Sequence, residues 1–93
     1  MIHAFKNPYV FEGQEYTEID IPMESMTGRD FEAAVKAWQR SGGKAAVPAL
    51  DSGFCAFAAA RFCKQPVEFF EGLPINEYVT VTTKIGNFLF STD

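Results

Sequence analysis

The segment from Phe54 to Cys63 constrains the fold more than any other part of this chain. Read as a helix, FCAFAAARFC carries one charged residue, Arg61, and places apolar or small side chains in every direction around its axis. A helix that is apolar all round is buried, either inside its own domain or beneath a partner. Because a chain of 93 residues has little room to surround a helix completely, this segment is a first indication of self-association or partner binding.

The composition predicts one folded domain over residues 1–93. Apolar residues make up 47% of the chain and include ten phenylalanines, more than a single small core needs. The formal net charge is −4 and the basic residues are scattered along the sequence, so we expect neither nucleic acid nor a membrane as a partner. With no signal peptide and no apolar run of about 20 residues, the sequence predicts a cytoplasmic protein.

Residues 4–22 predict a β-hairpin whose first strand is a short edge piece, because Pro8 lacks an N–H group. The chain reverses in a glycine-containing turn at Glu12-Gly13-Gln14. Alternation in the return strand predicts a core face and a water face, made respectively by Thr17, Ile19 and Ile21 and by Tyr16, Glu18 and Asp20. The acidic residues are interpreted as a solvated strand face, with a docking patch as the alternative.

Residues 27–91 predict a helical region of three main helices and one short helix. Thr27 is expected to cap the first helix, with Asp30 in the capping-box position, and Ser41-Gly42-Gly43 is expected to end it. The other helices are expected at about 52–64, 67–71 and 75–90. The predicted fold class is therefore α+β, an N-terminal hairpin followed by a small helical bundle.

Catalytic and metal-binding signatures are not recognisable in the sequence. His3, the one histidine, is expected in a frayed N-terminus. Cys55 and Cys63 lie about 12 Å apart along one predicted helix, too far for a disulfide, and are predicted to be reduced core thiols. Asp51-Ser52-Gly53 lacks the GxSxG frame of a nucleophile turn and is interpreted as a helix cap. We therefore expect no catalysis, no cofactor and no metal.

The surplus of apolar side chains predicts a protein-binding surface. The last predicted helix carries a second, thinner apolar stripe beside its main one, which favours contacts on two sides. We expect the hydrophobic core to include Phe31, Phe57 and Phe88. The candidate protein-binding residues are Phe54, Phe62, Phe69, Phe70, Val79 and Phe90.

Four pieces of the chain occur in a recognisable order. They are YVFEGQEYTEIDIPME, SMTGRDFEAAVKAW, ARFCKQPVEFFEGLP and YVTVTTKIGNFLF, and together they cover nearly the whole sequence. The order of hairpin, acidic helix start, proline-led short helix and closing helix ending in NFL resembles the tail assembly chaperones of long-tailed bacteriophages and related prophages.

The resemblance implies a non-catalytic protein that coats the tape-measure protein and keeps it soluble until tail-tube subunits polymerise around it. It also implies self-association into a homo-oligomer and absence from the finished particle. Many members of that family are made in two lengths by a ribosomal frameshift, and a chain that stops just after its last helix fits the short form. The alternatives are a minor tail or connector subunit retained in the virion and, third, a small regulatory or toxin-neutralising module.

Overall fold

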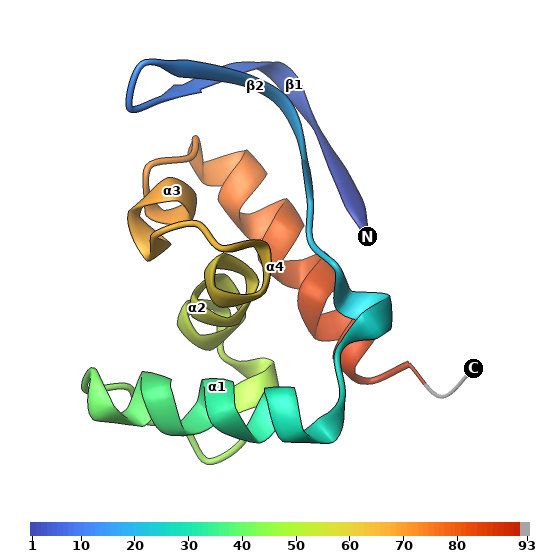
Figure 1. Cartoon of the computed structure of the whole chain (residues 1–93), viewed down its shortest axis with the longest axis vertical. Coiled ribbons are helices and arrows are strands. Elements are labelled where there is room, and N and C mark those ends of the chain that lie inside the picture. Colours follow the sequence, from blue (N-terminus) through green and yellow to red (C-terminus); the bar gives the residue numbers. More distant parts are fainter. Residues whose placement is uncertain (92–93) are drawn as a thin grey trace.

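A computed structural model describes residues 1–91, as an antiparallel hairpin followed by four α-helices, which confirms the predicted α+β class (Figure 1). The hairpin consists of β1, Ile2–Phe11, and β2, Gln14–Asp20. The helices are α1, Gly28–Arg40; α2, Ser52–Cys63; α3, Val67–Glu71; and α4, Ile75–Leu89. Two short 3-10 turns, η1 at Met23–Ser25 and η2 at Pro48–Leu50, lie before α1 and α2. No helix within residues 1–91 is long and apolar enough to cross a membrane.

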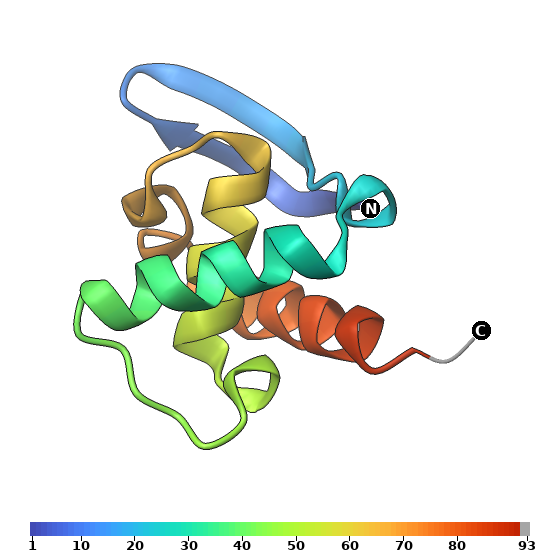
Figure 2. The ribbon, with the colours of Figure 1, turned by 60° about the horizontal axis from the view of Figure 1, so that its bottom comes forward.

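Helix α2 lies at the centre of the molecule, between α1 and the layer formed by α3, α4 and the hairpin (Figures 1 and 2). One side of it places Cys55 and Ala59 in a core with residues of β2, α3 and α4. The other side places Phe54 and Ala58 in a second core with Trp38 of α1. The apolar helix is therefore covered largely by its own chain, the first of the two alternatives that its composition allows.

Helix α1 forms where its local signals predict it. The Thr27 side chain accepts a hydrogen bond from the Asp30 amide, and the Asp30 carboxylate accepts one from the Thr27 amide, so the predicted capping box is present. The Trp38 ring, 8% exposed, meets the Phe54 ring edge-to-face with 5.4 Å between the ring centroids. This contact holds α1 against the first turn of α2.

The hairpin differs from its prediction in the length of β1 and in the side of the sheet to which two residues of β2 point. β1 is ten residues long, and the turn places Glu12 and Gly13 at positive φ, as a tight two-residue hairpin turn requires. Ala4 pairs with Glu18 and Tyr9 with Tyr16, so residues 5–8 of β1 bulge opposite a single residue of β2. The bulge shifts the alternation. Tyr16 packs on the core and Thr17 is exposed, the reverse of the predicted facing.

The N-terminus is part of the fold, which corrects the prediction that it frays. His3 is buried, and its Nε2 lies 3.0 Å from the Glu77 Oε1 atom of α4. The other Glu77 oxygen accepts a hydrogen bond of 2.7 Å from the Lys6 amide. A polar contact between residues 74 positions apart thus attaches β1 to α4, although no local pattern indicates it.

A candidate protein-binding groove

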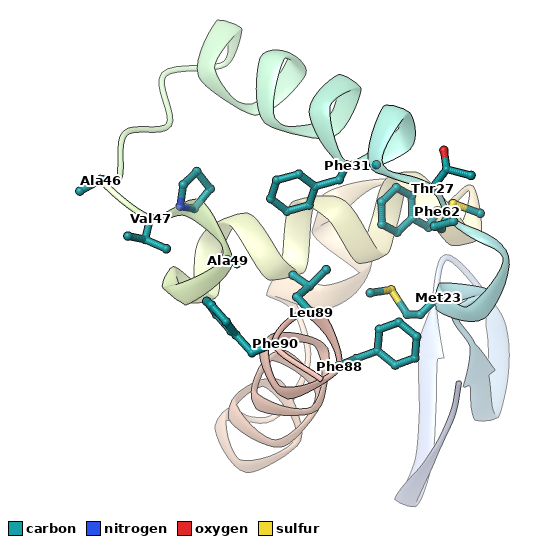
Figure 3. A pocket seen from close by; sticks show the side chains of 13 residues that line it. Met23, Thr27, Phe31, Ala46, Val47, Ala49, Phe62, Phe88, Leu89 and Phe90 are labelled. Atoms are coloured by element: carbon teal, nitrogen blue, oxygen red, sulfur yellow. The ribbon is translucent and has the colours of Figure 1, made fainter. Parts of the chain in front are cut away.

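An open apolar groove of about 570 Å³ lies beside the last turn of α4 (Figure 3). The chain around the start of α1 lines part of it, with Met23, Met26, Thr27, Gly28 and Phe31. The ends of two other helices also line it, with Phe62 of α2 beside Thr27 (Figure 3), and with Phe88, Leu89 and Phe90 at the end of α4. Residues 46–49, which lead into and through the start of η2, complete the lining. The volume lies within the range of about 300–1,000 Å³ typical of binding pockets.

The groove exists because α4 continues past the region where the core covers it. Val81 and Ile85 are fully buried, whereas Phe88, one turn further along, is 37% exposed. In Figure 3, Phe88 lies at the end of the groove near Met23, and Phe90 lies toward Val47 and Ala49. Aromatic rings at the end of one helix thus line both ends of the same hollow.

Among residues 1–91, those that line the groove include no charged side chain, and the one hydroxyl among them is already engaged. The Thr27 hydroxyl donates to the Asp30 carboxylate and accepts from the Asp30 amide. The side chains that remain are aromatic, aliphatic or thioether, and methionine adapts its shape to irregular apolar partners. Side chains of this kind pack well against another apolar surface.

Two of the six predicted binding residues, Phe62 and Phe90, line the groove. Phe90 is 53% exposed, while Phe62 is partly buried between the cores and the groove. Val79 is 54% exposed and lies on the same stripe of α4 as Phe90, but it does not line the groove. At a rise of 1.5 Å per residue it lies about 17 Å nearer the start of α4.

The other three predicted residues are buried, so their expected place on the surface is corrected. Phe54, Phe69 and Phe70 are all 0% exposed. Phe54 belongs to the core between α1 and α2. Phe69 is enclosed by a cluster of aromatic rings that comprises Phe5, Tyr9, Phe11, Tyr16 and Phe70. The irregular hairpin brings most of these rings onto α3, and the sequence pattern does not reveal that placement.

Sequence reasoning missed most of the lining. Phe31 and Phe88 were expected in the core, and Met23, Met26 and residues 46–49 were not singled out. A signal was available for Phe88, because it lies one turn beyond the last well-buried residue of the main stripe of α4. No comparable signal marks residues 46–49, since their position depends on how the loop between α1 and α2 packs.

Burial, complete for Cys55 and partial for Cys63, raises the pKa of both cysteine thiols. Burial raises the pKa of Cys55 to about 11, with a further contribution from the nearby Asp51 carboxylate. Burial also raises the pKa of Cys63 to about 11. Both thiols are free, in agreement with the reduced core thiols that were predicted. Within residues 1–91 no cluster of three or more histidine, cysteine or acidic side chains could hold a metal ion.

Comparisons with protein-family models, with curated proteins and with solved structures found no significant match to this chain. The fold and the groove are therefore interpreted from the chain's own residues.

Proposed function

We propose that this chain is a tail assembly chaperone of a long-tailed phage, which holds amphipathic helical segments of the tape-measure protein in its apolar groove within the host cytoplasm. The observation that carries the proposal is the groove itself, a hollow with uncharged lining and exposed aromatic rings at the end of α4. The motif order of the sequence, which resembles that family, supplies the identity of the client.

The lining suits a helix more than a compact ligand. An amphipathic helix places apolar side chains at positions i, i+3, i+4 and i+7, and such helices bind in open apolar grooves between helices. A compact ligand needs a few polar groups to fix its orientation, whereas this groove offers only apolar side chains and an engaged hydroxyl. Two methionines beside four phenylalanine rings favour tolerance for several related sequences, as a long helical client requires.

Co-expression with the tape-measure protein of the same genome tests the proposal. The wild-type chain is expected to increase the soluble fraction of the tape-measure protein and to co-purify with it. Phe90→Gln removes an exposed aromatic ring from the groove, and we expect it to weaken the binding of a tape-measure fragment by about tenfold or more, as loss of an aromatic anchor does.

Ile75→Gln is the matched control, because Ile75 is 82% exposed on the same helix and lies outside the groove. It is expected to bind like the wild type. Equal binding by Phe90→Gln and the wild type would reject the groove as the binding site, and failure of the wild-type chain to bind the tape-measure protein would reject the function.

Mass spectrometry of purified phage particles separates this function from that of a minor tail or connector subunit. An assembly chaperone leaves before the particle is complete, so the chain is expected to be absent. Its stoichiometric presence in virions would favour the structural subunit instead.

A further inference from the structure

The two methionines that line the groove differ in how far their thioethers are covered. Met23 is 3% exposed and belongs to the larger core, against which Met1 also packs. Met26 is half-buried and, among the residues that the structure describes, it is the methionine that belongs to neither core. The core therefore shields one thioether of the groove, whereas the other is covered only in part.

The backbone on both sides holds Met26 in the lining. Its amide donates a hydrogen bond of 3.2 Å to the Met23 carbonyl, which closes η1. The next residue, Thr27, is the N-cap of α1. Met26 is thus fixed between two helical segments while its side chain lies in the groove, outside both cores.

A partly exposed thioether is open to oxidation by a hydroperoxide. A lone pair of the sulfur attacks the outer peroxide oxygen, the O–O bond breaks, and the departing oxygen takes up the proton of the transferred oxygen. The sulfur loses two electrons and the peroxide gains them, so the products are one sulfoxide and one molecule of water or alcohol. The sulfoxide is polar where the thioether was apolar.

The cysteine thiols are poorer targets for the same oxidant at neutral pH. The thiolate is the reactive form of cysteine, and burial raises the pKa of both Cys55 and Cys63 to about 11. Met26 is therefore the sulfur of this chain that burial protects least.

A sulfoxide at Met26 changes binding more than folding. The Thr27 hydroxyl, the one hydroxyl of the lining, already donates to the Asp30 carboxylate, so the lining side chains within residues 1–91 offer the sulfoxide oxygen no free donor. Water solvates this oxygen in the empty groove. An apolar helix that binds there excludes the water and leaves a polar group buried without a partner, which lowers its affinity.

We propose that Met26 is an oxidation site that regulates the groove: conversion to the sulfoxide by a hydroperoxide releases the apolar client, and reduction of the sulfoxide restores binding. A methionine sulfoxide reductase performs the reverse step, in which two thiols become a disulfide and the oxygen leaves as water. The inference rests on the proposed function for the identity of the client.

Limited treatment of the full chain with hydrogen peroxide tests the site. By peptide mass spectrometry, Met26 is expected to gain one oxygen atom before Met23 and Met1 do, and the circular dichroism is expected to stay unchanged. Binding of a tape-measure fragment is expected to weaken by about tenfold or more. Methionine sulfoxide reductases of both stereospecificities are expected to restore it.

Met26→Leu and Met23→Leu are matched variants, because leucine is apolar, similar in size to methionine and resistant to this oxidant. For each protein, the measured quantity is the ratio of its dissociation constants after and before treatment. Met26→Leu is expected to give a ratio near one, whereas Met23→Leu is expected to lose affinity as the wild type does. An apolar fluorescent dye that binds the groove is the second probe, with the same expected pattern.

Three results would overturn the proposal: earlier oxidation of Met23 or Met1, unchanged binding by protein oxidised at Met26, or an equal loss of affinity in Met26→Leu. The dye separates these results from a failure of the proposed function. If the untreated protein does not bind the tape-measure fragment, the proposed function is rejected, while dye binding still shows whether oxidation of Met26 makes the groove unfavourable for apolar molecules.

Discussion

At the residue scale, a short chain of polar contacts attaches the N-terminal strand to the last helix. The Lys84 ammonium lies 3.1 Å from His3 Nδ1 and can only donate, so Nδ1 accepts and Nε2–H donates to the Glu77 carboxylate. Burial disfavours the charged form of Glu77, but hydrogen bonds from the Lys6 amide and from His3 outweigh it, and the pKa of Glu77 lies below its ordinary value of 4.5.

A substitution at Glu77 is therefore expected to have a pH-dependent effect on stability. Glu77→Ala leaves the Lys6 amide and His3 without their acceptor and should lower the free energy of unfolding by about 1–3 kcal/mol at pH 7. Because the folded-state pKa is lowered, the ionised carboxylate stabilises the fold above pH 4.5, and this contribution is lost as the pH falls through the folded-state value.

Urea unfolding of the wild type and Glu77→Ala at neutral and at acidic pH measures this contribution. The difference between the two proteins is expected to shrink on acidification. Thr83→Ala, an exposed change on the same helix, is the control and should leave stability nearly unchanged. A difference that stays constant between the two pH values would contradict the assigned role of the carboxylate.

At the element scale, α1 ends against its own tryptophan. The Gly43 amide donates to the Trp38 carbonyl, and a Cβ atom at Gly43 would collide with the Trp38 ring. Glycine is therefore required at Gly43 for close packing, whereas Gly42, at positive φ, directly follows the helix C-cap. The sequence predicted the helix end, but the contact with the ring depends on how the following loop folds back.

Gly43→Ala is expected to destabilise the protein by about 1–3 kcal/mol, because the methyl group forces the Trp38 ring or the loop to move. Gly28→Ala is the matched control, since nothing lies within 4 Å of the added Cβ and alanine favours the helix. Thermal unfolding of both variants checks the prediction. A melting temperature of Gly43→Ala equal to that of the wild type would contradict it, because the loop would then make room for the methyl group without loss of stability.

Local sequence signals predicted the helices and their ends, whereas the orientation and burial of side chains depended on contacts between residues distant in the sequence. The capping box at Thr27, the Asp51 cap of α2 and the bounds of α3 each follow from neighbouring residues, and all three are confirmed. The predicted hairpin faces hold from Glu18 to Ile21 but are reversed at Tyr16 and Thr17. The reversal lies where a bulge in β1 shifts the register, and alternation alone does not reveal a bulge.

At the scale of the whole molecule, the sequence indicated an excess of apolar side chains but not which of them remain uncovered. Periodicity places Phe54 and Phe90 on helices, but it does not show how far the neighbouring helices and strands extend over each of them. The fold buries Phe54 completely between α1 and α2, and it leaves Phe90 at the end of α4 beyond the core. The groove therefore gathers part of the uncovered apolar surface, while Ile75 and Val79 stay exposed outside it.

The three methionines allow the central claim to be tested on the intact protein. Met23 and Met26 line the groove, whereas Met1 packs against the larger core and does not line it. The protein is labelled at its methionine methyl groups and titrated with an unlabelled helical fragment of the tape-measure protein. Methyl NMR spectra then report on the groove and on the larger core in the same experiment. The account predicts that the Met23 and Met26 signals shift while the Met1 signal stays. Saturating fragment with no shift at Met23 and Met26, or with a shift at Met1 alone, would contradict it.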